Sequence, residues 1–278
     1  MATITIKNKD GKQIVLGNSA PFILTRMDGV SNVNNDISTQ KTPRQDGSTY
    51  IFNSLGNRYI RLEGTTIGTS SEVLANKRLI NEIVNPKLGK VTLIYNDGVR
   101  NAEIEGVAES SAVFGTDKTP TRQPFAVSFE CHQPFWVEPL TESEVIALRM
   151  GGISFKLRLP TTFASRGQRR KCNNTGDTET PVLIKFYGPG DNPTITNENT
   201  GEFIKVEQSL GADDILEIST EFGNKYVRLN GVNKFNFIDL DSTFWQLQRG
   251  TNVLSYSSLD DSERTSVLVE WKNRYIGF

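Results

Sequence analysis

Histidine and cysteine are scarce in this chain of 278 residues, which holds one histidine, His132, and two cysteines, Cys131 and Cys172. Two cysteines exclude a disulfide framework, and together with one histidine they give no zinc-binding pattern. A single histidine also restricts acid-base catalysis, for which histidine is the residue most often used. We therefore expect no enzymatic activity, no metal and no cofactor.

An excess of charge of one sign and a long hydrophobic run are missing as well. Lys and Arg number 31 against 32 Asp and Glu, for a formal net charge of -1. A nucleic-acid-binding protein usually has a basic excess, so we expect no specific nucleic-acid binding. No segment approaches the roughly 20 apolar residues of a membrane helix, and the first residues alternate like a strand, unlike a signal peptide. We expect no membrane insertion and synthesis in a cytoplasm.

Residue types used in catalysis gather at one place, where Ser128, Glu130 and His132 follow each other at every second position. Alternate residues of a strand share a face, so this spacing needs no catalytic explanation. The chain also has no G-x-S-x-G elbow, no Walker A sequence and no dinucleotide fingerprint. We interpret His132 as a surface or interface residue.

The stretch 123–136, QPFAVSFECHQPFW, combines a strand with a proline-bounded aromatic exit. Its apolar residues at every second position from Phe125 to Cys131 predict a strand with one buried face. Pro134 lacks a backbone donor and holds the preceding residue extended, so the strand should end there. We place a domain boundary after this exit, with domains at 1–140 and 141–278, and expect Phe135 and Trp136 to pack between them.

Three local signals organise the rest of the first domain. Asp10-Gly11 and Asn96-Asp97-Gly98, each between apolar runs, predict β-hairpins. Thr69 and Glu72 form a capping-box pattern before an apolar stripe, which predicts a helix over 70–84 that packs on a sheet. Asn85-Pro86 should end that helix.

A polar stretch over 26–57 is too long for an ordinary loop in a compact domain. It contains a few isolated apolar residues: Ile37, Tyr50, Ile51 and Phe52. We predict an extended arm whose apolar side chains contact a surface elsewhere, and we assign these four residues to a contact between subunits.

The second domain is expected to begin with a short linking helix over 142–150. From Pro181 onward short apolar runs alternate with Gly- and Asn-containing turns, which is typical of a β-sandwich. Trp245 lies beside a turn, where an aromatic ring is either a core residue or a contact for a sugar or protein partner. The predicted fold class is therefore mainly β, with an α+β first domain built of a sheet and one packed helix.

These features, in this order, resemble the distal tail protein family of long-tailed, non-contractile phages (siphophages). In the first half the resemblance is carried by RYIRLEG, the capped helix with its Asn-Pro stop, the Asn-Asp-Gly hairpin and Pro134-Phe135-Trp136. In the second half it is carried by KYVRLNGVNKF, STFWQLQRGTNVLSY and the final VLVEWKNRYIGF. The Gln133-Pro134 pair departs from the Asp-Pro expected at that corner.

The resemblance implies a split-barrel first domain that forms a homo-hexameric ring at the distal end of the tail tube, and a galectin-like sandwich as the second domain. The arm would be the belt by which one subunit embraces the next. The implied partners are the major tail (tube) protein, the tail-associated lysin or hub, and receptor-binding or baseplate proteins. The protein would reside at the virion tail tip after assembly in the bacterial host cytoplasm. The alternative function is a carbohydrate-binding host-adhesion protein that acts through the second domain.

Overall fold

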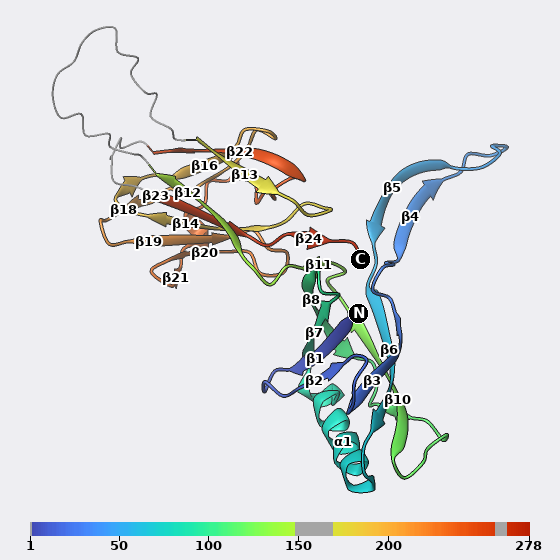
Figure 1. The fold of residues 1–278 in the computed structure, drawn as a ribbon. Helices are drawn as coiled ribbons and strands as arrows, with labels where there is room; N and C mark the ends of the chain where they lie inside the picture. The colour runs from blue at the N-terminus through green and yellow to red at the C-terminus, as the bar shows by residue number, and fades with distance from the viewer. Residues whose placement is uncertain (1, 148–168, 259–265) are drawn as a thin grey trace, which may run out of the picture. The chain divides into compact units, whose positions relative to one another are not determined.

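The computed structural model describes residues 2–147, 169–258 and 266–278, and these residues are predominantly β-strand (Figure 1). They divide into two compact units. Unit 1 comprises Met1–Pro139 together with Tyr275–Phe278, and unit 2 comprises Leu140–Arg274. The last four residues thus return to the unit in which the chain begins.

Unit 1 is built around one large antiparallel sheet with the strand order β2-β1-β7-β8-β10-β6-β3. Its strands are β1 (Thr3–Asn8), β2 (Gln13–Leu16), β3 (Phe22–Asp28), β6 (Arg58–Ile67), β7 (Lys90–Asn96), β8 (Asn101–Ala108) and β10 (Arg122–Cys131). The short strands β9 (Val113–Phe114), β11 (Trp136–Val137) and β24 (Arg274–Tyr275) pair at its margins. A bridge between Gly17 and Ile23 joins the two ends of this order, so the sheet curls into a split barrel.

The core of unit 1 follows from strand periodicity. Buried and less buried residues alternate along β10, and Phe125, Val127, Phe129 and Cys131 are all buried, as the sequence predicts. The predicted hairpins are also present: β1 pairs with β2 across Asp10-Gly11, and β7 pairs with β8 across Asn96-Asp97-Gly98.

Helix α1 (Ser70–Ile83) closes one side of the barrel. Thr69 and Glu72 form the predicted capping box, in which each side chain bonds the other residue's backbone N–H. Val73, Ile80 and Ile83 are its buried residues. A 3-10 turn, η1 (Pro86–Leu88), follows the helix and confirms that Asn85-Pro86 ends it.

The observed arm is shorter than the predicted one, which spanned residues 26–57. Residues 22–28 form β3, which pairs with β6 inside the sheet, because their alternating side chains find a partner strand there. The part that stands out is a two-stranded ribbon of β4 (Asn35–Gln40) and β5 (Thr49–Leu55) (Figure 1). Within the described residues these two strands pair only with each other. We call β4 and β5 the arm ribbon.

Unit 2 is a β-sandwich of two antiparallel sheets. One sheet has the order β12-β23-β14-β19-β20-β21 and the other β13-β22-β16-β17. The larger sheet consists of β12 (Glu142–Ala147), β14 (Val182–Tyr187), β19 (Ile215–Ser219), β20 (Tyr226–Leu229), β21 (Val232–Asn233) and β23 (Ser266–Trp271). The smaller sheet consists of β13 (Arg169–Asn174), β16 (Thr194–Asn197), β17 (Glu202–Lys205) and β22 (Gly250–Ser257). The remaining elements are β15 (Gly190–Asp191), β18 (Ser209–Leu210) and the 3-10 turn η2 (Phe235–Phe237).

The prediction of a linking helix over 142–150 is wrong for the residues described, since 142–147 form strand β12. This strand pairs along its whole length with β23, with Glu142 opposite Trp271 and Ile146 opposite Val267. Ile146 is buried in the unit 2 core. A partner strand so distant in sequence is invisible to a local pattern. The rest of the predicted helix, 148–150, lies outside the described residues.

Candidate assembly interface

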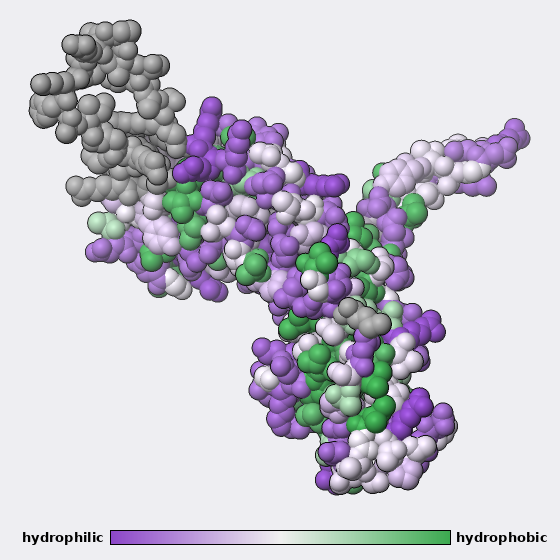
Figure 2. Space-filling view, in the orientation of Figure 1, coloured by the Kyte–Doolittle hydropathy of each residue, from purple (hydrophilic) through white to green (hydrophobic). Residues whose placement is uncertain are grey.

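Among the described residues, the arm ribbon carries a run of three consecutive exposed apolar side chains on one strand and a fourth on the other. The exposed fractions are 60% for Ile37, 59% for Tyr50, 51% for Ile51 and 58% for Phe52. These are the four arm residues singled out in the sequence. Figure 2 shows a hydrophilic ribbon tip, with hydrophobic residues at the surface closer to the sheet.

Within the described residues the arm ribbon is a sheet of two strands only, and its apolar side chains are exposed. Successive strand residues point to opposite faces, so Tyr50, Ile51 and Phe52 place apolar groups on both. Polar contacts within the ribbon are local, such as Asn53 Nδ2 to Asn35 Oδ1 at 2.8 Å. An isolated two-stranded hairpin is marginally stable in water. The ribbon is therefore suited to gain stability from a second surface.

The ribbon is anchored at its base by Arg58, which is the first residue of β6, lies three positions after the end of β5 and is only 1% exposed. Its Nε donates to Pro134 O at 2.7 Å, and its Nη2 donates to Ile276 O. Its Nη1 lies 2.7, 3.0 and 2.9 Å from the carbonyl oxygens of Gly29, Val30 and Asn32. Burial lowers the pKa of the guanidinium, and nearby Cys131 opposes this more weakly. Among the described residues no carboxylate pairs with Arg58, so backbone carbonyls hold its charge.

Sequence reasoning missed Arg58, although a signal was present. Arg58 shares a strand face with Ile60 and Leu62, and all three are buried. A charged residue in register with a buried apolar face requires specific partners, because burying an unpartnered charge is costly. That register marks Arg58 as a structural anchor.

Trp136 belongs to the core of unit 1. It is fully buried, its Nε1 donates to Val30 O at 3.1 Å, and its ring lies 6.0 Å from those of Tyr95 and Phe278. Trp136 thus packs among residues of unit 1, and its assignment to interdomain packing stays a prediction. Phe135 is half-buried, and its assignment to interdomain packing stays a prediction.

Trp245 is 2% exposed and packs in the core of unit 2. A sugar-binding aromatic residue offers an open ring face to its ligand, and Trp245 has none. Of the two alternatives at this turn, the core residue is correct. The proposed sugar or partner contact through Trp245 is therefore withdrawn.

The Ser128, Glu130 and His132 set shows no catalytic arrangement. Glu130 Oε1 accepts from Asn57 Nδ2 at 2.7 Å and from Tyr59 Oη at 3.1 Å. The Asn57 bond, followed by the Tyr59 bond and by weaker attraction from His132, lowers the pKa of Glu130. The carboxylate is thus committed to neighbours on β6 and the ribbon base. His132 is exposed beyond the end of β10.

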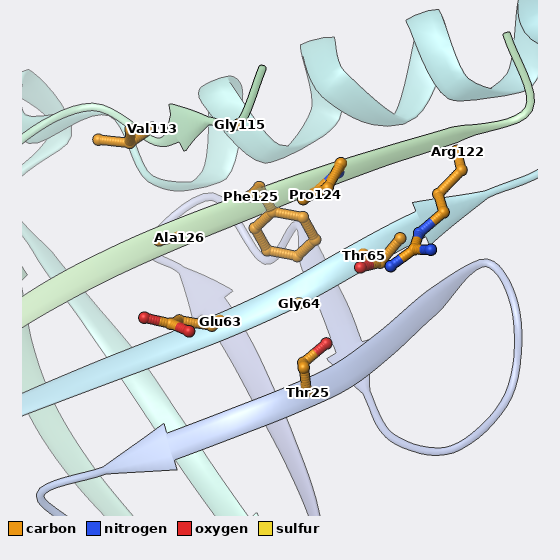
Figure 3. A pocket seen from close by; sticks show the side chains of 10 residues that line it. All are labelled: Thr25, Glu63, Gly64, Thr65, Val113, Gly115, Arg122, Pro124, Phe125 and Ala126. Carbon is orange, nitrogen blue, oxygen red and sulfur yellow. The ribbon is translucent and has the colours of Figure 1, made fainter. Parts of the chain in front are cut away.

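A shallow cleft of about 280 Å³ lies over β3, β6 and β10 (Figure 3). Its charged lining residues are Glu63 and Arg122, which point from different strands in Figure 3. Glu63 already forms an ion pair with Arg61 at 3.0 Å. Apolar side chains such as Val113 and Phe125 line much of the rest. This lining brings together no nucleophile with a general base.

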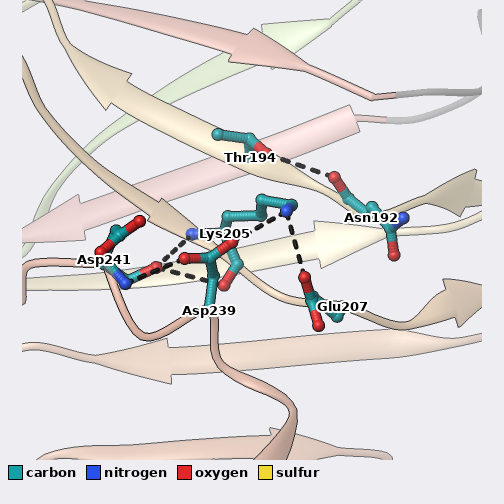
Figure 4. Close-up of polar contacts among 7 residues, drawn as sticks. Asn192, Thr194, Lys205, Glu207, Asp239 and Asp241 are labelled. Carbon is teal, nitrogen blue, oxygen red and sulfur yellow. Dashed lines mark hydrogen bonds and ion pairs between the residues drawn. The ribbon is translucent and has the colours of Figure 1, made fainter.

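Acidic residues of unit 2 surround Lys205 (Figure 4). Lys205 Nζ lies 2.8 Å from Asp239 Oδ2 and 3.2 Å from Glu207 Oε1. These bonds, that to Asp239 first, raise the pKa of Lys205, while the bond from Lys205 lowers the pKa of Asp239. Asp241 N donates to Asp239 Oδ1 at 2.9 Å. The group therefore ties the loop after η2 to the end of β17.

The described residues contain no group of three or more His, Cys, Asp or Glu side chains arranged to hold a metal ion. Within the same residues, none of the helices is long and apolar enough to cross a membrane.

Two family models match this chain, one in each unit. The phage tail protein RIFT-related domain matches residues 9–131, and the siphovirus-type tail component, C-terminal domain, matches residues 175–275. Together the two matches identify a two-domain tail component of a siphophage. The chain belongs to the siphophage distal tail protein family, and it is a structural component of the phage tail and baseplate hub.

Solved structures share the fold over the whole length. The Dit protein of phage SPP1, described as a paradigm of the hub adsorption apparatus in phages that infect Gram-positive bacteria, is 15% identical, with 98% of each chain covered and a TM-score of 0.71. Chains of the phage P2 baseplate in its activated conformation are 11% identical with 100% of each chain covered, at TM-scores of 0.57 with Ca and 0.56 with Sr. No curated protein sequence matches the chain. The predicted fold class, including the galectin-like sandwich, is confirmed.

Proposed function

We propose that the protein forms a homo-hexameric ring at the distal end of a siphophage tail tube, with the arm ribbon of each subunit lying on its neighbour. The observation that carries the proposal is the exposure of Ile37, Tyr50, Ile51 and Phe52 on a ribbon that no other described strand covers. A ring requires heterologous contacts, in which one patch of a subunit meets a different patch of the next. A projecting ribbon supplies one such patch. The choice of six copies rests on the family resemblance.

In this proposal the ring connects the tube to the tail tip. One face contacts the major tail (tube) protein, the other contacts the tail-associated lysin or hub, and receptor-binding or baseplate proteins attach at the periphery. The protein acts at the virion tail tip after assembly in the bacterial host cytoplasm. Its role is architectural, without enzymatic activity. The SPP1 structure is described as part of a hub adsorption apparatus and the P2 chains as part of a baseplate, which supports this role.

The carbohydrate-binding alternative depended on the aromatic residues of unit 2, and its candidate contact, Trp245, is not open to a sugar. Trp245 and Trp271 are both core residues there. We therefore propose no second function.

The test of the ribbon is a double variant, Tyr50→Ser with Phe52→Ser. Fully burying an aromatic side chain contributes about 1.5–3 kcal/mol, and each of these rings has more than half of its surface left to bury. Losing both should raise the dissociation constant of each contact roughly thirtyfold or more. Light scattering coupled to size-exclusion chromatography should show the mass of the wild-type oligomer fall towards that of a monomer.

The matched control is Val99→Ser, which removes an apolar side chain that is 91% exposed at the turn between β7 and β8. This variant should assemble like the wild type. If the double variant and the control assemble equally well, the ribbon does not make the contact.

A further inference from the structure

We propose that the segment Tyr275–Phe278, by which the chain returns from unit 2, sets the position of the arm ribbon by acting on Arg58. We call Tyr275–Phe278 the return segment, and we call residues 29–34 and 56–58 the ribbon root. The inference rests on the proposed role of the ribbon in assembly. It adds positioning residues that lie outside the ribbon itself.

The ribbon root brings the two ends of the ribbon together. Gly56 N donates to Asn34 O at 2.9 Å. Gly29 has a φ of +87°, and a Cβ at this position would lie 1.9 Å from Tyr59 O, so only glycine allows the two backbones to approach this closely. Arg58, which follows β5, bonds the carbonyls of residues that precede β4. Its guanidinium thus joins the entering and leaving chains.

The return segment supplies one of the carbonyls that hold Arg58. Nη2 of Arg58 donates to Ile276 O, and Ser31 Oγ donates to Phe278 O. Gly277 lies directly against the ribbon root, because a Cβ on Gly277 would lie 2.5 Å from Ser31 O. The segment therefore touches both sides of the root.

An aromatic cluster fixes the return segment in place. The Phe278 ring stacks on Tyr95 with centroids 5.4 Å apart and an interplanar angle of 5°, and it lies 5.7 Å from the ring of Tyr275. The guanidinium of Arg100 lies over the Phe278 ring, 5.4 Å from its centroid. Tyr275 Oη donates to Glu138 Oε1 at 2.9 Å. These contacts hold the Ile276 carbonyl where Arg58 needs it.

The arrangement makes the direction of the ribbon depend on the return segment. Beyond the ribbon root, β4 and β5 pair with no other described strand, so the root orients the ribbon. The Arg58 donors are occupied by backbone carbonyls, and losing one leaves a buried donor unsatisfied. Displacing the return segment should loosen the root while the barrel strands keep their own hydrogen bonds.

The test compares Gly277→Ala with Gly115→Ala in the full chain. A Cβ on Gly277 clashes with the Ser31 backbone, whereas a Cβ on Gly115 meets Pro124 at an ordinary contact distance of 3.4 Å. For Gly277→Ala we expect about tenfold faster hydrogen exchange in 29–34 and 56–58, with unchanged exchange in β10. The assembly measured by light scattering should fall towards monomer, as in the ribbon variant. Gly115→Ala should match the wild type in both measurements.

A second pair of variants covers the case in which Gly277→Ala does not fold. Phe278→Ala removes the stacked ring and should give the same two effects, and Phe278→Tyr keeps the ring and should restore both. Wild-type exchange at the ribbon root in Gly277→Ala and Phe278→Ala would overturn the inference. Faster exchange with undiminished assembly would also overturn it. A wild-type protein that never assembles would refute the proposed function instead, and the exchange data would still decide whether the return segment holds the root.

Discussion

At the scale of single residues, unit 1 concentrates its most demanding hydrogen bonding at Arg58. Burying a guanidinium without a carboxylate partner costs free energy of desolvation. Hydrogen bonds to the backbone carbonyls of Gly29, Val30, Asn32, Pro134 and Ile276 offset this cost. These carbonyls come from three separate stretches of sequence. Arg58 therefore requires the fold around it to be complete, which explains why its partners cannot be read from a local pattern.

The two cysteines are a further consequence of burial at the residue scale. Desolvation raises the pKa of the Cys131 thiol to about 12 and that of the Cys172 thiol to about 12. Their ordinary value is 9.0, so the folded protein retains protons between pH 9 and 12 that the unfolded chain releases. The contribution of these thiols to stability is complete below pH 9 and is lost as the pH rises through this window.

We predict that iodoacetamide modifies neither cysteine in the folded protein at pH 8 and modifies both in urea, because the thiolate is the reactive form. Mass spectrometry of the intact protein measures this directly. The free energy of unfolding should also fall between pH 9 and 11, and the double variant Cys131→Ala, Cys172→Ala should show a smaller fall. Rapid modification of Cys131 in folded protein would contradict its buried, protonated state.

At the scale of elements, local signals were sufficient where the element is defined by its own residues. The capping box of α1, the two Gly-containing hairpins and the alternation along β10 were all predicted from sequence. Non-local pairing was not accessible in the same way. Strand β12 was mistaken for a helix because its partner β23 lies at the other end of unit 2. Residues 26–28 were assigned to the arm because their pairing with β6 was not apparent.

In the candidate site too, residues marked by their neighbours in sequence were predicted, and contacts between distant residues were not. The apolar residues of the arm ribbon were found from sequence because they interrupt a polar stretch. Trp245 was misleading, since its position beside a turn fits both a core residue and an exposed one, and only the packing of the two sheets decides. The ribbon root was missed because its contacts bring together positions near both ends of the chain.

The capping box allows a quantitative prediction for α1. Thr69→Ala should lower the free energy of unfolding by about 1 kcal/mol, as is typical for loss of an N-cap side chain. Urea-dependent hydrogen exchange of the α1 amides measures this change. The control Ser70→Ala, at an exposed neighbouring position, should stay within about 0.5 kcal/mol of the wild type.

The same box sets a pH dependence. The backbone N–H of Thr69 and then its hydroxyl bond the Glu72 carboxylate and lower its pKa below the ordinary 4.5. The stabilisation is present above pH 4.5 and is lost as the pH falls through the lowered pKa. The difference in free energy of unfolding between the wild type and Thr69→Ala should therefore become smaller below pH 4.5. A difference in the free energy of unfolding that is constant down to pH 3 would show that the bond from the Thr69 hydroxyl to Glu72 makes no ionic contribution.

At the scale of the whole molecule, unit 2 is inserted into unit 1. The chain leaves unit 1 after β11 and returns through β24, and these two strands pair with each other. The return segment then reaches the ribbon root. The residues that follow the end of unit 2 in sequence thus belong to unit 1 and supply partners at the base of the arm ribbon. Unit 2 is thus continuous in sequence with the segment that we propose positions the arm ribbon.

The most direct test of the proposed ring is negative-stain imaging of the purified protein, with particles averaged in classes and without imposed symmetry. The account predicts six-fold rings with a central hole in the wild type and their absence in the Tyr50→Ser, Phe52→Ser variant. Rings that persist in that variant would contradict the role of the ribbon. A wild-type protein seen only as single subunits, at the highest concentration at which it stays in solution and in the presence of its tube protein, would contradict the ring itself.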